Sequence, residues 1–224
     1  MTEVKRTGQH VRSRLSRARV LQTAVAVADQ GGIGALTIRT LAQELGVKPM
    51  SVYYYVLNKE AILDGIVDNV FSEIVLPRVG ADWRAEMRRR AHSVRTVLGR
   101  HSWAIGLLES RPRPGPATLR HHDAVLGTLR SAGFSREMTA HAYALIDSFS
   151  YGFALQEASL PFEAQHIVAD GSEPDATLFT DDQYPHMAAM VSEHYVQPGY
   201  RFSDEFDFGL NLILDALDAT LSVD

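Results

Sequence analysis

The chain has 224 residues, of which 46% are hydrophobic and 22% are charged, with no cysteine and a net charge of −5. This composition excludes a disulfide framework, a thiolate zinc site and a cysteine nucleophile, and the length suits one large domain or two small ones. No segment approaches the ~20 consecutive apolar residues of a membrane helix, so we expect a cytoplasmic protein with no membrane partner.

The charge is distributed unevenly along the chain. Residues 1–59 carry nine Lys and Arg against three Asp and Glu, a net charge of +6, whereas the remaining residues carry 13 against 24, a net charge of −11. A basic head on an acidic body indicates that the head binds a polyanion such as nucleic acid. Residues 5–14 contain four of the basic side chains, and this arm either follows a minor groove or is a disordered tail.

Apolar residues recur at three- and four-residue steps along nearly the whole chain, which predicts an all-α fold. In the head, helices are expected from Ser16 to Asp29, after a Thr37 cap, in a short segment from Pro49, and from an Asn58 cap to residue 76. In the body they are expected near residues 82–100, 103–110, 116–132, 135–159, 181–196 and 203–222.

The stretch IRTLAQELGVKPMSVYYYV, residues 38–56, has the pattern of a helix-turn-helix. Ala42 is small, as required where two helices approach closely, and Gly46 follows at the turn. The second helix of this motif enters the major groove of DNA. We predict that Tyr53 and Tyr54 face DNA while Tyr55 leans towards the core, although aromatic packing alone would account for two of the three tyrosines.

Residues 15–75 resemble the N-terminal domain of the tetracycline-repressor (TetR) family, through LTIRTLAQELGV, the tyrosine-bearing second helix and NKEAIL. The body is more weakly similar to the regulatory domain of tetracycline repressors, through GADWRAEMRRRAHSVR, GFSREMTAHAYALIDSFSYGFALQ and FDFGLNLILDALDATL. The resemblance implies a three-helix DNA-binding head and a larger helical ligand-binding and dimerisation body. We therefore expect a basic flexible arm at 1–14, a helix-turn-helix domain at 15–60 and the body at 61–224, with a linking helix at 58–76.

The resemblance also implies roles in DNA binding. Thr37, Tyr53 and Lys59 match phosphate-contacting positions, and Arg39 matches an arginine that reads a base, as the guanidinium fork fits guanine. Pro49 and Met50 stand where relatives carry Gln or Thr, which favours contact with thymine methyl groups. The predicted DNA-binding residues are Thr37, Arg39, Lys48, Pro49, Met50, Ser51, Tyr53, Tyr54 and Lys59.

Two apolar stripes at helical spacing lie within residues 135–159 and 203–222. Taken alone, each stripe reads best as internal core. The resemblance instead implies that these two helices pair with their copies in a homodimer, which matches a palindromic operator. The predicted interface residues are Phe149, Phe153, Leu210, Ile213, Leu214, Leu217 and Leu221.

Polar residues on otherwise apolar faces of the body predict a mostly apolar cavity with a few orienting hydrogen bonds. Each of these residues, taken singly, is more often a surface group or a satisfied core group. Met187 and Met190 are expected to close the cavity from the partner subunit. The predicted ligand-binding residues are Arg90, Val94, Trp103, Leu107, Leu108, His122, Val125, Tyr143, Asp147, Ser148, Tyr151 and Gln156.

Leu108 and Gln156 match the positions at which a tetracycline repressor holds the magnesium ion of its drug complex. A hydrocarbon and a neutral amide are poor ligands for a hard cation. We therefore expect no cofactor and no metal, and a small hydrophobic inducer that acts without magnesium.

The interpretation that unites these patterns is a transcriptional repressor, which binds double-stranded DNA at a palindromic operator and leaves it on binding a small molecule. The alternative is a helical enzyme acting on a small hydrophobic substrate. No nucleophile elbow, His-Glu-x-x-His motif or glycine-rich phosphate loop supports the enzyme. A nucleoid or adaptor protein without a ligand is a third class.

Overall fold

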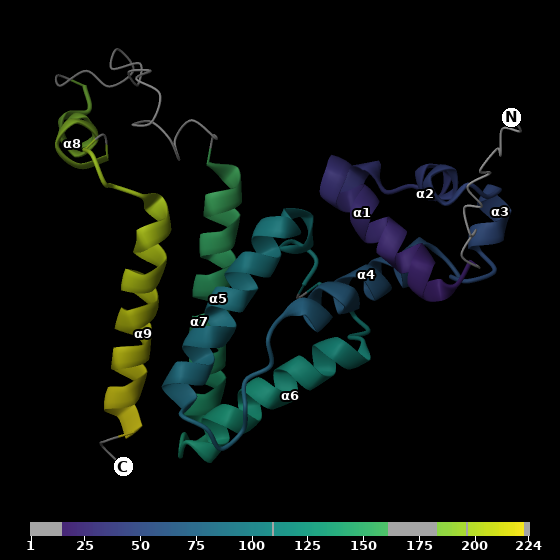
Figure 1. Cartoon of the computed structure of the whole chain (residues 1–224). Helices are drawn as coiled ribbons and strands as arrows, with labels where there is room; N and C mark the ends of the chain where they lie inside the picture. The colour runs from purple at the N-terminus through teal and green to yellow at the C-terminus, as the bar shows by residue number, and fades with distance from the viewer. Residues whose placement is uncertain (1–14, 109, 161–182, 196, 222–224) are drawn as a thin grey trace, which may run out of the picture.

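The computed structural model describes residues 15–108, 110–160, 183–195 and 197–221 (Figure 1). Within these ranges the chain forms helices joined by turns and loops and contains no strand, which confirms the predicted all-α fold. The predicted basic arm at 1–14 lies outside the described residues.

The head consists of α1 (Arg17–Ala35), α2 (Ile38–Leu45) and α3 (Pro49–Val52). Two of the predicted caps form, because the Ser16 hydroxyl accepts a hydrogen bond from the Arg19 amide at 3.2 Å and the Thr37 hydroxyl accepts one from the Thr40 amide at 3.0 Å. Gly46 ends α2 in the left-handed conformation (φ 66°), as the turn of the motif requires. The three helices and the start of α4 enclose one apolar cluster, which we call the head core.

Two local predictions in the head need correction. The first helix does not end at Asp29 but runs to Ala35, with the chain leaving helical geometry only at Gly32 (φ 71°). The recognition helix α3 is a single turn that ends at Val52, so the three tyrosines lie in the turn that follows it. Gly31 and Gly32 therefore mark a kink, and the consecutive tyrosines do not share one regular helix.

The helix α4 (Lys59–Glu73) connects the head to the body. Asn58 caps its first turn by accepting a hydrogen bond from the Ala61 amide at 2.8 Å. The first half of α4 contributes Ile62 and Ile66 to the head core, and the second half contributes residues such as Phe71 to a separate cluster, which we call the α4 core. One helix therefore carries side chains of two cores.

The body contains α5 (Trp83–Arg100), α6 (Pro116–Ser131), α7 (Arg136–Ser159), α8 (Pro185–Met190) and α9 (Glu205–Leu221). In Figure 1, α5, α7 and α9 run along one another, α6 lies along α4, and α8 stands beyond the end of α9. The expected helix at 103–110 is instead a 3₁₀ turn at Ser102–Ala104 followed by further turns. The described part of the segment expected near 181–196 is α8 and a short π-helix at Val191–Tyr195.

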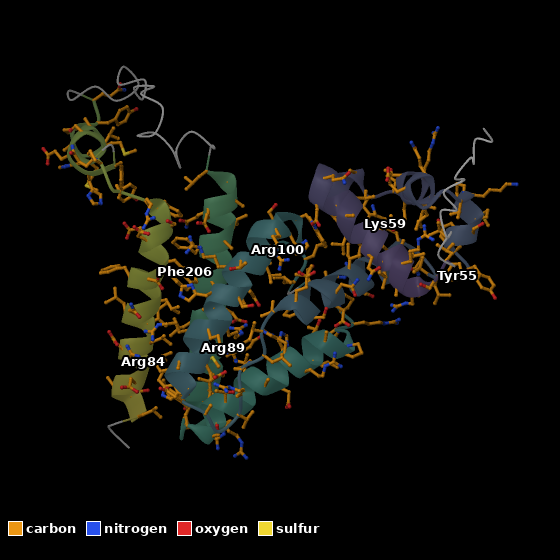
Figure 2. All side chains as sticks on the ribbon, viewed as in Figure 1. Tyr55, Lys59, Arg84, Arg89, Arg100 and Phe206 are labelled. Carbon is orange, nitrogen blue, oxygen red and sulfur yellow. The ribbon has the colours of Figure 1, made fainter. Side chains whose placement is uncertain are left out.

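The helix α9 packs its apolar stripe against its own chain. Phe206, Leu210 and Leu214 are fully buried in a cluster shared with α5, α6 and α7, which we call the α9 core, and Phe206 is labelled between the helices in Figure 2. A row of polar contacts holds α9 to α5 alongside this stripe. It joins Arg84 to Asp215, Arg88 to Asn211, and His92 to Asp207.

Most of the predicted dimer residues are buried within a single chain. Phe153, Leu210, Leu214 and Leu217 are at most 7% exposed within one chain. Phe149, Ile213 and Leu221 are partly buried against the same α9 core. The stripe is internal core, because spacing along a helix identifies the buried face but not the partner that covers it.

A different apolar face of these two helices is exposed. Leu145 and Leu155 of α7 are each 52% exposed, and Phe208 and Leu212 of α9 are 65% and 55% exposed. These four side chains define what we call the outer face. A single chain thus leaves a large apolar surface uncovered on two helices.

The burial of Leu214 predicts a large loss of stability when its side chain is truncated. Leu214→Ala should lower the free energy of unfolding by about 2–5 kcal/mol, because the cavity cannot close completely. Leu119→Ala, at a position on α6 that is 55% exposed, should change it by no more than about 0.5 kcal/mol. Urea unfolding at one fixed protein concentration measures both, and equal effects would contradict the assignment of the stripe to internal core.

Candidate DNA-binding surface and ligand cavity

The predicted DNA-binding side chains gather on one exposed part of the head. All nine residues of that set are exposed, including Met50 at 76% and Tyr54 at 86%. Tyr55 packs partly buried against the head core, with its ring centre 5.2 Å from that of Tyr54. Figure 2 places Tyr55 and Lys59 in the head, remote from α9. The structure thus orients the tyrosines as predicted, and it adds Leu57, 87% exposed beside Lys59, which the sequence analysis did not single out.

Two helices, α2 and α4, begin on this surface. The Thr37 hydroxyl accepts from the Thr40 amide and lies 2.7 Å from the Thr40 hydroxyl, a contact in which either hydroxyl can be the donor. Lys59 is exposed at the first turn of the 15-residue helix α4, where the helix dipole also attracts anions. The surface therefore combines positive charge with oriented donors.

A polar cluster is buried where α5, α6 and α7 meet. Arg90 is fully buried, and its Nε donates to His121 Nε2 at 3.0 Å while its Nη1 donates to Asp147 Oδ1 at 2.5 Å. The Tyr151 hydroxyl donates to Asp147 Oδ2 at 3.2 Å. The structure thus joins three predicted ligand-binding residues, Arg90, Asp147 and Tyr151, in one chain of hydrogen bonds that ends at His121.

His121 was not among the predicted site residues. It is fully buried, and burial together with the adjacent Arg90 charge lowers the pKa of its imidazole to about 2. Its position four residues before the buried Val125 places it on the inner face of α6, and that spacing is the signal that identifies it. His121 is therefore neutral at physiological pH.

A cavity of about 180 Å³ lies beside this cluster, between α4, the segment before α6, and α6 itself. Two predicted ligand residues, Leu108 and His122, line it. Val94 and Val125 are buried in the adjoining cores, and Tyr143 is partly buried against the α9 core. The side chains around the cavity are Asp64, Val67, Leu108, Arg111, Arg113, Pro114, Gly115, Thr118 and His122.

Ion pairs and hydrogen bonds connect the cavity wall to α4. Arg111 pairs with Asp64 at 2.7 Å and with Glu60 at 2.6 Å, and these contacts raise the pKa of its guanidinium, the hydrogen bond to Glu60 most of all. Asp68 accepts from the Thr118 amide at 2.8 Å and from its hydroxyl at 3.1 Å, near the start of α6. The wall of the cavity is therefore bonded directly to side chains of α4.

Four predicted ligand residues lie elsewhere. Trp103 donates its indole N–H to Asp29 at 2.7 Å, and both it and Leu107 pack at the junction of the head core and the α4 core. Ser148 and Gln156 are exposed on α7. The helix that was expected to turn Trp103 and Leu107 inward does not form. On α7, neighbouring residues point in different directions around the helix axis, so Asp147 points inward whereas Ser148 points outward.

The described residues contain no group of three or more histidine, aspartate or glutamate side chains that could hold a metal ion. Within the same part of the chain, no helix has both the length and the apolar character needed to cross a membrane.

Comparison with known proteins matches both parts of the chain. Residues 20–66 match the description "Bacterial regulatory proteins, tetR family", and residues 76–221 match "Tetracyclin repressor-like, C-terminal domain". The chain is 30% identical over 217 residues to the HTH-type transcriptional repressor DrrR1 of Streptomyces coeruleorubidus, covering 93% of this chain and 79% of that protein.

Two further relatives extend the match. The class A tetracycline repressor from transposon 1721 of Escherichia coli is 30% identical over 201 residues, covering 88% of each chain. The crystal structure of a possible TetR family transcriptional regulator from Streptomyces coelicolor A3(2) has a TM-score of 0.71 and 29% identity, covering 92% of this chain and 100% of that one. The chain belongs to the TetR family of bacterial transcriptional regulators and is a DNA-binding regulator, not an enzyme.

Proposed function

We propose that this regulator is a repressor that acts in the cytoplasm as a homodimer. It binds a palindromic operator and releases it when a small hydrophobic molecule occupies the cavity beside the buried Arg90 cluster. The observation that carries this proposal is that α4 joins the exposed DNA-binding surface to the wall of that cavity. The names of its relatives, a transcriptional repressor and a tetracycline repressor, support the same function.

On DNA, Arg39 reads a base edge, while Lys59, Thr37 and Tyr53 bind phosphates. All four side chains are exposed, so they reach DNA without rearrangement of the head core. Pro49 and Met50, at the start of α3, contact apolar groups in the major groove.

Substitution of the two basic residues should separate base reading from phosphate binding. Arg39→Ala should weaken binding to the selected operator by about 1–3 kcal/mol and relax preference at one base pair. Lys59→Ala should weaken binding to all sequences alike and make it less dependent on salt. Arg120→Ala is the control, because it removes the same charge from an exposed arginine on α6. Selection from random-sequence DNA followed by titration at several salt concentrations measures these effects, and equal wild-type affinity for random and selected DNA would refute the proposal.

The dimer forms through the outer face, because this face leaves four large apolar side chains exposed on adjacent helices. Gly152 on α7, and Ala216 and Ala219 on α9, lie among them and allow close approach of two copies. The helix α8 has no buried residue within its own chain, and Met187 and Met190 are 43% and 42% exposed. We infer that these methionines contact the partner subunit, where their flexible side chains can close its cavity.

Leu212→Asp should dissociate the dimer, because it places two symmetry-related charges in an apolar interface. The fold should survive, since Leu212 is exposed in the single chain. Sedimentation should show a monomer with normal helical circular dichroism and strongly reduced operator binding. Leu119→Asp is the matched control, as an exposed leucine outside the outer face, and it should remain dimeric. A dimeric Leu212→Asp protein would place the interface elsewhere.

The inducer acts without magnesium, because Leu108 offers no metal-binding atom and the Asp64 carboxylate that also lines the cavity is paired with Arg111. Compounds that release the protein from its selected operator should therefore do so equally with and without EDTA. Leu108→Trp should block the cavity, so that the same compounds no longer change the affinity of the protein for its operator. A dependence on magnesium for every effective compound would contradict this account.

A further inference from the structure

A polar cluster attaches the head to the body at a second place besides α4. Asp29 belongs to α1 of the head, and its Oδ1 atom accepts a hydrogen bond from the indole N–H of Trp103 at 2.7 Å. The same oxygen lies 2.7 Å from Nδ1 of His101, the residue that caps the C-terminal end of α5. Trp103 and Leu107 also pack against the head core. The end of α5 and the turns after it are therefore bonded to the head directly.

The other ring nitrogen of His101 faces the end of α4. Its Nε2 atom lies 3.4 Å from Oε2 of Glu73, the last residue of that helix, and the same oxygen lies 2.9 Å from Nη2 of Arg100. His101 is 6% exposed, so its ring is largely removed from water. Figure 2 labels Arg100 at the end of α5 that is nearest to the head. The imidazole thus lies between a carboxylate of the head and a carboxylate of the connecting helix.

The two carboxylates determine which form of the ring can bond to both of them. Trp103 donates to Asp29 and Arg100 pairs with Glu73, which identifies both oxygens as acceptors. A neutral imidazole has one N–H and directs the lone pair of its other nitrogen at a carboxylate, whereas a protonated imidazole donates from both nitrogens. The bridge from α1 through His101 to α4 is therefore complete only when the ring is protonated.

Protonation of His101 also balances the charge of the cluster. Asp29 from α1 and Glu73 from α4 are negative, and Arg100 from α5 is positive, so these three groups sum to −1 and the protonated ring brings the sum to 0. Histidine is the side chain that changes its charge between about pH 5 and 8. A proton is therefore a ligand of this bridge.

We propose that His101 is a positioning residue for DNA binding and makes operator affinity depend on pH. Its protonated ring ties α1 and the end of α4 to the end of α5, and loss of the proton releases one of these two contacts. The bridge fits one position of the head on the body, and a proton that binds one conformation better than another shifts the equilibrium between them. The inference rests on the proposed function, because it depends on the change of conformation that accompanies operator release.

The pH dependence of operator affinity tests the inference. Full-length wild-type protein and a His101→Gln variant are titrated against the same selected operator between about pH 6 and 8, at one salt concentration. The ratio of the two affinities should change by about fivefold or more, as is typical of coupled binding events. Its direction shows whether the DNA-bound or the DNA-free conformation holds the bridge. Because glutamine does not titrate, a purely structural role of His101 would give a constant ratio, which would overturn the inference.

Two further variants locate the effect. His92→Gln removes a histidine of the same helix that pairs with Asp207 of α9 at 2.9 Å, and it should keep the wild-type pH profile. Asp29→Asn removes the charge of the head carboxylate but keeps an oxygen that can accept from Trp103, so it should reduce the pH dependence as His101→Gln does. A wild-type profile in Asp29→Asn would exclude the bridge as the cause.

The design separates failure of the inference from failure of the proposed function. If selection from random-sequence DNA yields no preferred operator, both are contradicted. If an operator is found and the ratio of affinities does not change with pH, only the role of His101 is wrong. Circular dichroism checks the fold of each variant. Should His101→Gln not fold, Asp29→Asn decides alone, since the Asp29 side chain is 30% exposed and tolerates an isosteric change more readily.

Discussion

The arrangement of the molecule depends on one helix that is buried in two cores. The first half of α4 contributes Ile62, Leu63 and Ile66 to the head core, and the second half contributes Val67 and Phe71 to the α4 core. Close packing makes both environments sensitive to small displacements of their side chains. A rotation or translation of α4 that suits one core must therefore be accommodated by the other.

This constraint gives the polar contacts along α4 their importance. Arg111 holds Asp64 and Glu60 from the cavity side, and Asp68 accepts from Thr118 at the start of α6. A methyl group added at Gly115 would lie 2.2 Å from the carboxyl carbon of Asp68, so the backbone before α6 approaches α4 closely. The segment that lines the cavity and the helix that carries Lys59 are thus in direct contact. A ligand of this cavity shifts the operator equilibrium only if it binds the DNA-bound and the DNA-free conformations with different affinity.

Helical periodicity and capping residues predicted the elements well where each helix buries one face against a neighbour. The structure has α5, α6 and α7 within one residue of the predicted bounds, and the caps at Ser16, Thr37 and Asn58 form. Prediction was poorer where the chain is held by contacts distant in sequence. In the turns after His101, the indole N–H of Trp103 donates a hydrogen bond to Asp29. Helical periodicity cannot predict such a contact.

The two kinds of site differed in how far sequence alone could identify them. Residues on the DNA-binding surface are exposed and follow a local motif, so Arg39 and Tyr54 lie where predicted. The cavity is built from helices that meet only in the fold, and the sequence analysis did not single out the buried His121, whereas Ser148, which it included, is exposed away from this cavity. The stripe through Leu214 correctly indicated a buried face, but its partner proved to be the same chain.

The central claim is that the cavity wall and the DNA-binding surface are coupled through α4. Coupling between two sites is reciprocal, so operator binding must alter the cavity wall even when no ligand is present. Amide hydrogen exchange of the dimer, measured with and without its selected operator, tests this most directly. The account predicts changed exchange in the second half of α4 and in residues 110–118, in addition to protection of the head. Changes confined to residues 15–60 would contradict it.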